Sequence, residues 1–329
     1  MNFLKTFLAG LLAFVVGSVL SFFLWFILLI GIVASMGGSS PVIVPSESIL
    51  KIDLAETVTD APMTDPMAGF NFMTMNVKSQ MPLYKALQSI DAAASDDRIK
   101  GIYLRLNGAG GIESLAVLEE LRHALAEFKK SGKFIVSYNE TYSQGAYYLA
   151  SVADKIYLQP QGGMEWVGLA SNGMFFKGLL DKLGVKAEVF RPTVCKYKSA
   201  VEPYILDKMS PANREQMQQL VDSMWKTLSE TVAEARGIDY AALQRMTDRL
   251  EVVLPEDALE KGFVDSLLYE DQMNDVFAEL EVEADDEDNY NFVSLSDYAS
   301  QLSADLKHLA SPQVAIVYAD GEIVDGNGN

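Results

Sequence analysis

The sequence predicts an α/β fold with a largely parallel sheet, placed behind one N-terminal transmembrane helix. A long uncharged apolar run at the N-terminus predicts the membrane helix. Short apolar runs typical of strands then alternate with longer amphipathic segments, as in βαβ units. The 329 residues are 49% hydrophobic and 22% charged, which is typical of a folded chain of one or two domains.

The charge balance and the rare residue types exclude several classes of function. A formal net charge of -19 argues against a nucleic-acid partner, because contacts to phosphates need a basic surface. The single cysteine, Cys195, cannot form a disulfide within the chain. The two histidines are too few for a histidine-rich metal site. His123 lies in a helical pattern and is expected on a helix surface, whereas His308 lies in a polar connecting region.

The apolar run predicts a membrane anchor. No residue from Phe7 to Met36 is charged, and about 20 apolar residues in a helix suffice to cross a bilayer. A cleaved signal peptide has an apolar region of only about 7–15 residues, and no clear cleavage site ends this run. Lys5 precedes the run and favours a cytoplasmic N-terminus. We therefore expect residues 1–40 to hold a cytoplasmic stub, a single-pass anchor in the inner membrane and a linker, with the bulk of the chain in the periplasm.

The segment after the linker is expected to begin with a strand at Ile49–Leu54. A stretch with five methionines, Met63–Met81, has no clean period and is interpreted as an exposed apolar loop. It could contact lipid or another subunit, or it could pack on its own core. Leu83–Ala94 has the pattern of an amphipathic helix.

Two strand and helix units follow. The first has a strand at Ile99–Leu106, a glycine turn at Asn107–Gly111 and a helix at Glu113–Lys130. The turn matches neither GxGxxG nor a P-loop, so nucleotide binding is not expected, and a packing turn explains it as well as a set of backbone donors. The second unit consists of a strand, a helix and a strand at Phe134–Tyr138, Ser143–Ala153 and Lys155–Leu158.

The C-terminal half is predicted to be mainly helical. Ser210 and Pro211 are typical of a helix start, and Gly237 of a helix end, which predicts a long helix to about Arg236. Four apolar residues at a spacing of four predict one stripe along it: Leu220, Met224, Leu228 and Val232. The other expected elements are helices at Phe175–Leu183, Tyr240–Leu250 and Glu256–Lys261, strands at Val185–Phe190 and Phe263–Leu267, and a solvated acidic segment at Glu279–Asp288.

Two lysines stand out in the apolar and aromatic run Phe190–Tyr204. Lys196 and Lys198 flank Tyr197. Burial disfavours the ammonium form of a lysine, and a neutral lysine can act as a general base that activates a serine hydroxyl. Alternatively, both lysines are surface charges whose aliphatic stems pack on the aromatic rings. The residues alone leave both interpretations open.

Two motifs and the predicted anchor point to a family. The segment Tyr197-Lys-Ser-Ala-Val-Glu-Pro203 and the segment from Tyr142 to Ile156 resemble the lysine motif and the first-repeat segment of the signal peptide peptidase SppA family (protease IV), in its long two-repeat form. The resemblance covers nearly the whole chain and implies a ClpP/crotonase-like fold. It also implies a general-base lysine in the first repeat and a nucleophilic serine in the second. The motif match puts the base, as proton donor and acceptor, at Lys198, with Lys196 less favoured.

The resemblance further implies the activity. It is that of a membrane-anchored serine endopeptidase with a Ser-Lys dyad, which degrades cleaved signal peptides and other apolar peptides and assembles as a homo-tetramer. Membrane lipid is an expected partner and nucleic acid is not. No metal and no cofactor is implied, because hydrolysis by this route needs only a base, a nucleophile, oxyanion donors and water.

The nucleophile is expected to be absent from this repeat. The second repeat of the family carries its serine in the motif Ala-Ser-Gly-Gly-Tyr. When this chain is aligned with that repeat on Ala153–Ile156, Gln144 takes the position of the serine. Glutamine cannot accept an acyl group, and Ser143 is one residue away from that position. Ser199, next to Lys198, is expected to be a supporting hydrogen-bonding group, as is Tyr197. Cys195 is the stronger intrinsic nucleophile but has no histidine partner, so a buried thiol is expected.

The end of the chain resembles its beginning. With Glu322 placed over Glu56, an offset of 266, Ile316 matches Leu50 and Val324 matches Val58. We therefore expect a first repeat at residues 46–310 and a truncated second repeat at residues 311–329. A complete chain with that period would have about 580 residues.

Two rival functions remain. The peptidase fold could survive here as a catalytically inactive scaffold or assembly module in the membrane, which the missing serine favours. A crotonase-type acyl-CoA enzyme would share the fold, but an anchor that holds the chain away from cytoplasmic CoA argues against it.

Overall fold

The computed structural model describes residues 2–37, 43–53, 57–60, 70–71, 76–77, 80–106, 114–190, 195–285, 289–306 and 317–318. The chain divides into two compact units, Met1–Ile43 and Val44–Asn329. This division falls between the predicted anchor and the predicted first repeat. The repeat boundaries themselves, at residues 46–310 and 311–329, stay a prediction.

The first unit is dominated by one apolar helix. Helix α1 (Asn2–Gly37) contains a 24-residue segment, Lys5–Leu28, that is long and apolar enough to cross a membrane. The side chains of that segment are exposed. A membrane anchor or a signal sequence explains such a helix, and its orientation in a membrane stays a prediction.

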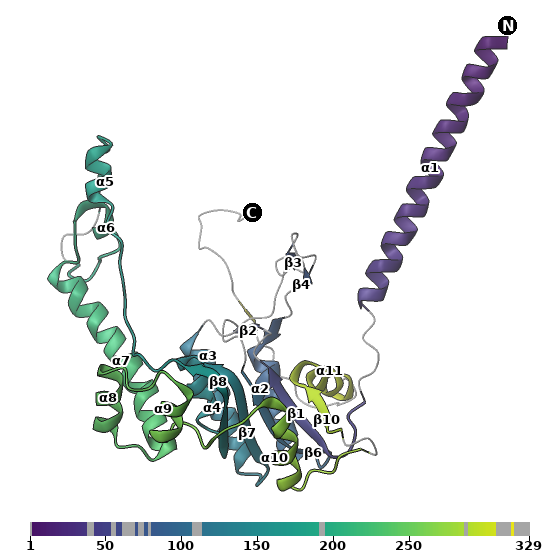
Figure 1. Cartoon of the computed structure of the whole chain (residues 1–329). Helices are drawn as coiled ribbons and strands as arrows, with labels where there is room; N and C mark the ends of the chain where they lie inside the picture. The colour runs from purple at the N-terminus through teal and green to yellow at the C-terminus, as the bar shows by residue number, and fades with distance from the viewer. Residues whose placement is uncertain are drawn as a thin grey trace. The chain divides into compact units, whose positions relative to one another are not determined.

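The second unit is built on a six-stranded sheet in the order β10-β1-β6-β7-β8-β9, in which every neighbouring pair is parallel (Figure 1). The prediction of an α/β fold with a parallel sheet is therefore confirmed. The strands are β1 (Ser48–Asp53), β6 (Ile99–Arg105), β7 (Phe134–Tyr142), β8 (Lys155–Met164), β9 (Ser266–Leu267) and β10 (Asn291–Ser294).

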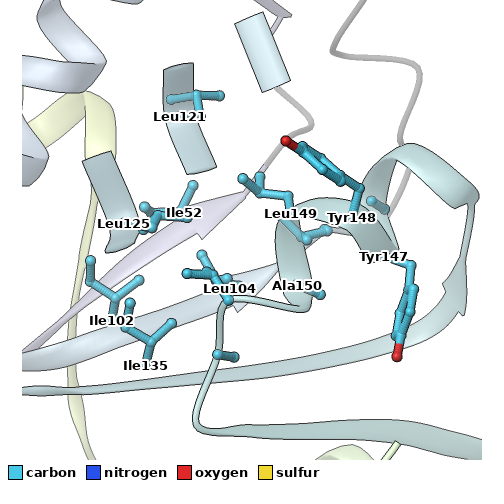
Figure 2. Packing of buried hydrophobic residues seen from close by; sticks show 14 of the residues in the cluster. Ile52, Ile102, Leu104, Leu121, Leu125, Ile135, Tyr147, Tyr148, Leu149 and Ala150 are labelled. Carbon is cyan, nitrogen blue, oxygen red and sulfur yellow. The ribbon is translucent and has the colours of Figure 1, made fainter. Parts of the chain in front are cut away.

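Helices bury both faces of the sheet. One face packs against α2 (Leu83–Ser95), α3 (Leu115–Lys129) and α4 (Gln144–Ala150). Figure 2 shows the resulting core, in which strand side chains such as Ile52 lie beside helix side chains such as Leu125. On the other face, α10 (Met273–Glu279) contributes residues to a smaller cluster around Tyr103 and Tyr138. Central strands covered on two sides are nearly continuously apolar, as parallel strands are expected to be.

The long helix α7 (Pro211–Arg236) follows its predicted boundaries. Ser210 caps it by accepting a hydrogen bond from the Asn213 N–H, and Gly237 ends it at a φ of 64°. The predicted apolar stripe, however, is buried only over its C-terminal half. Leu228 and Val232 belong to the core, whereas Leu220 is 51% exposed and Met224 is also exposed. Two short helices, α5 (Lys177–Lys182) and α6 (Glu202–Ile205), lie near the N-terminal end of α7 (Figure 1).

The expected strand at Val185–Phe190 is wrong. These residues form neither a helix nor a strand, and both end residues are exposed. β-propensity stabilises a segment only when a neighbouring strand and a core face are available, and none of the described strands pairs with this segment. Conversely, the sequence did not reveal β10, a four-residue strand that completes the sheet beside β1.

The remaining elements surround this framework. They are α8 (Tyr240–Asp248), α9 (Pro255–Glu260), α11 (Leu295–Leu306), the 3-10 helix η2 (Glu270–Gln272), and two small strand pairs, β2 (Thr57–Thr59) with β5 (Gln80–Pro82) and β3 (Phe70–Asn71) with β4 (Asn76–Val77).

Several predicted segments lie wholly or largely outside the described residues. They are the glycine turn at Asn107–Gly111, most of the loop at Met63–Met81, His308 and most of Val314–Asp325. The acidic segment is described up to Asp285, where its carboxylate residues are exposed, as expected.

Candidate active site

The segment that contains the two predicted lysines, residues 195–202, is held in a compact turn; we call it the lysine segment. The Lys198 N–H donates to the Cys195 carbonyl at 3.3 Å, and the Glu202 N–H donates to the Ser199 carbonyl at 2.9 Å. Glu202 is the first residue of α6. Helix α6 therefore begins only four residues after Lys198.

Lys198 lines a hollow of about 500 Å³ beside α7. Its other lining residues are Phe190, Tyr197, Ser199, Ala200, Val201, Gln216 and Met217. The surroundings are thus partly apolar and aromatic, as predicted, but Lys198 itself is exposed. Within this chain, Lys198 is therefore a surface residue, as the second of the two interpretations expects, and not a buried lysine.

Lys196 takes part in a three-membered polar cluster. Its Nζ lies 3.0 Å from Glu215 Oε2 and 2.9 Å from the Tyr197 hydroxyl, and that hydroxyl donates to Glu215 Oε1 at 3.2 Å. The hydrogen bonds to Tyr197 and to Glu215 raise the pKa of Lys196. A raised pKa keeps an ammonium protonated, which is the opposite of what a general base needs. These contacts favour the protonated form of Lys196, and Tyr197 contacts both Lys196 and Glu215.

The other nucleophile candidates near Lys198 have backbone roles in the turn. The Cys195 and Ser199 carbonyls accept the two hydrogen bonds that close it. Both residues are half-buried, so the fully buried thiol expected at Cys195 is not found.

Gln144, which the alignment predicts to stand at the serine position, is tied by its side chain to the loop after β8. Its Oε1 accepts from the Val167 N–H at 2.8 Å and from the Gly168 N–H at 2.7 Å, and its Nε2 donates to the Gly168 carbonyl at 2.9 Å. Both ends of the amide are thus satisfied. The glutamine has a structural role here, which holds the loop against the start of α4.

Ser143 caps α4. Its Oγ accepts from the Ala146 N–H at 3.3 Å. The helix cannot easily turn to bring this hydroxyl to the position of Gln144, because Tyr147 is fully buried and donates to the Phe263 carbonyl at 2.6 Å. Figure 2 shows Tyr147 and Tyr148 on this helix. Desolvation raises the pKa of Tyr147, in keeping with a neutral, anchored phenol.

Lys198 and the two residues at the start of α4, Ser143 and Gln144, lie in different surroundings. The residues that line the hollow at Lys198 come from the lysine segment, Phe190 and α7, whereas Gln144 bonds to the loop after β8. No described residue of α4 lines the hollow. His123 is exposed on α3, as expected, and the described part of the chain contains no group of three or more His, Cys, Asp or Glu arranged to hold a metal.

Glu202 and Glu215 were missed by the sequence reasoning. Glu202 is only 4% exposed, and Glu215 pairs with Lys196. The signal for Glu202 was its presence inside the lysine motif, but an acidic residue next to a proline does not by itself indicate burial.

Comparisons with known proteins point to one family. The model of Peptidase family S49 matches residues 127–285, which include α4, the lysine segment and α7. "Protease 4" from Salmonella typhi is 34% identical over 330 residues, which are 96% of this chain and 52% of that protein. "Protease 4" from Haemophilus influenzae is 32% identical over 326 residues, 93% of this chain and 51% of that protein. A "Serine protease SPPA, chloroplastic" from Arabidopsis thaliana is 29% identical over 212 residues, 63% of this chain and 30% of that protein. The chain spans about half the length of the two Protease 4 relatives.

Proposed function

Because the chain belongs to peptidase family S49, the SppA family with its ClpP-like fold, we propose that it provides the general-base half of a membrane-anchored serine endopeptidase. Lys198 is the general base, and the nucleophilic serine comes from a second repeat. The observation that best supports this division is the place of Lys198, the lysine that matches the family motif. It lines a hollow of about 500 Å³ together with apolar residues such as Phe190 and Met217.

The proposed reaction uses Lys198 Nζ twice. As the serine Oγ attacks the peptide carbonyl carbon, Nζ takes the hydroxyl proton and then passes it to the leaving amine. Nζ next takes a proton from a water that attacks the acyl-enzyme, and returns it to the serine. Because Lys198 is exposed in this chain, the serine-bearing repeat and the substrate must cover Nζ before it can act as a neutral base.

The proposed substrates are apolar peptides such as cleaved signal peptides. Phe190 is 94% exposed and lines the hollow together with Met217 and Val201, so apolar side chains are available beside Lys198. The predicted anchor would tether the chain to the membrane, with the body in the periplasm. Assembly as a homo-tetramer would help to cover the exposed lysine.

A second candidate function is an inactive scaffold or assembly module. The observation that favours it is Gln144, which the alignment places at the serine position and whose amide makes three hydrogen bonds to the loop after β8. An acyl-CoA function of the crotonase type has no support from the relatives, which are named as proteases.

Hydrolysis of a fluorogenic apolar peptide by the full-length protein distinguishes the two functions. The peptidase proposal expects turnover that a serine-directed phosphonate abolishes by labelling a residue outside 1–329. If the full-length protein shows no turnover and takes up no label, the scaffold is the better account. Turnover by residues 1–329 alone, lost in Ser143→Ala, would show that this repeat contains its own nucleophile.

A further inference from the structure

A buried carboxylate lies four residues after Lys198. Glu202 is 4% exposed, and its two oxygens accept three hydrogen bonds from the start of α7. Oε1 accepts from the Ser210 hydroxyl at 2.6 Å, and Oε2 accepts from the Ser210 N–H at 3.1 Å and from Asn213 Nδ2 at 3.0 Å. A carboxylate is costly to bury unless such donors satisfy it, so this arrangement is specific.

The three donors belong to the N-terminus of α7. Ser210 is its N-cap, and the Ser210 hydroxyl also accepts from the Asn213 N–H at 3.1 Å. A negative charge is favourable at this end of a helix, because the free N–H groups and the helix dipole both attract it. Through its side chain, Glu202 therefore connects the start of α6 to the N-terminus of α7.

The bridge determines where Lys198 lies. One hydrogen bond closes the turn Cys195–Lys198 and a second closes the turn Ser199–Glu202, so two consecutive turns join Lys198 to Glu202 and limit how far one can move without the other. On the other side of Lys198, Lys196 and Tyr197 bind Glu215, which is one and a half turns into α7. Lys198 is thus placed between two connections to the same helix.

The two connections differ in strength. Lys196 and Glu215 are both exposed, so water and salt screen their ion pair and it adds little stability. Glu202 and Asn213 are buried and Ser210 is half-buried, so loss of the Glu202 carboxylate would leave the donors of Ser210 and Asn213 without their acceptor where water has limited access.

We propose that Glu202 is the positioning residue for the general base. Its carboxylate fixes the lysine segment on α7 and thereby sets the position from which Lys198 reaches the serine. This inference rests on the proposed function of Lys198 and assigns Glu202 no contact with substrate.

The test uses three variants of the full-length protein: Glu202→Ala, Glu202→Gln and, as a matched control, Glu230→Ala. Glu230 is an exposed glutamate of α7 that pairs with Lys226 at 3.7 Å. Two quantities are measured: amide hydrogen exchange of peptides that cover residues 195–213, and kcat and KM for an apolar fluorogenic peptide, each scaled to the folded fraction.

Glu202→Ala is expected to raise exchange in residues 195–213, with no change in β6 and β7, and to lower kcat about 100-fold with little change in KM. A loss of that scale follows when a reacting group is displaced by about 1 Å. Glu202→Gln is expected to recover most of kcat, because its amide oxygen can accept from the Ser210 N–H and Asn213 while its amide nitrogen donates to the Ser210 hydroxyl. Glu230→Ala is expected to match the wild type.

A Glu202→Ala protein with faster exchange but kcat within twofold of the wild type would overturn the proposal, since Glu202 would then have only a local structural role. If Glu202→Ala does not fold, Ser210→Ala, which removes the donor of the shortest bond, replaces it. An unchanged kcat in Ser210→Ala would overturn the proposal in the same way. Failure of the underlying function gives a different result, because Lys198→Ala would then retain activity whatever the Glu202 variants do.

Discussion

Replacing Gln144 with alanine tests whether its side chain holds the loop after β8. The substitution removes three hydrogen bonds, two to backbone N–H groups and one to a carbonyl. Val167 is exposed, so water can replace its bond at little cost, whereas Gly168 is half-buried and loses both a donor and an acceptor partner. With about 1 kcal/mol for each of the two less exposed bonds, the expected loss is about 2 kcal/mol.

The assay is guanidinium denaturation of the full chain followed by tryptophan fluorescence. Trp166 is the residue before Val167 and is completely buried, with its ring centroid 5.2 Å from that of Trp225, so unfolding around this loop changes the tryptophan emission. The matched control is Gln218→Ala, which removes an exposed glutamine that donates to Asp222 on α7. The control should change the free energy of unfolding by less than about 0.5 kcal/mol.

A Gln144→Ala protein as stable as the Gln218→Ala control would refute this reasoning. It would mean that the amide is replaceable by water and that the loop is held by other contacts. The structural explanation for a glutamine at this position would then be wrong.

Three further outcomes are expected. Gly162→Ala should destabilise the protein by about 3 kcal/mol in the same assay, because an added Cβ would lie 1.8 Å from the Glu140 carbonyl oxygen. Gly163→Ala should cost less than about 1 kcal/mol, because the nearest atom to an added Cβ there is 3.9 Å away. Hydrogen bonds from Arg98 lower the pKa of Asp96 to about 2. Asp96→Asn should therefore cost about 1–2 kcal/mol at pH 7, and the difference should vanish as pH falls from about 4 to 2, because a carboxyl with a depressed folded-state pKa stabilises the fold only while ionised. A reporter that works only in the periplasm should be active when fused after Ser40. Activity of a cytoplasm-only reporter at the same point would contradict the proposed orientation.

Elements determined by local chemistry were predictable from the sequence. The cap at Ser210, the proline after it and the left-handed turn at Gly237 define α7 without reference to the rest of the fold. The alternation of strands and helices likewise predicted the parallel sheet. The strand expected at Val185–Phe190 failed because its pattern says nothing about whether a partner strand exists. The apolar stripe on α7 was right in its spacing, but spacing cannot tell which half the core covers.

The candidate site was predictable only in part. The lysine motif drew attention to Lys198, and the alignment to Gln144, but their surroundings depend on contacts between distant residues. The pairing of Lys196 with Glu215 joins positions 19 apart, and the buried cap at Glu202 needs donors from two residues of another helix. No periodicity in the sequence encodes such contacts. For the same reason, the exposure of Lys198 became visible only in the folded chain.

The most direct test of the central claim compares Lys198→Ala with Lys196→Ala in the full-length protein, using kcat/KM for an apolar fluorogenic peptide and circular dichroism as a check of folding. The two lysines lie on either side of Tyr197, so each is the control for the other. We predict that Lys198→Ala lowers kcat/KM by at least about 1,000-fold, the scale seen when one member of a catalytic unit is lost, while Lys196→Ala lowers it less than about tenfold. Loss of activity in Lys196→Ala with retention in Lys198→Ala would contradict the assignment of the base.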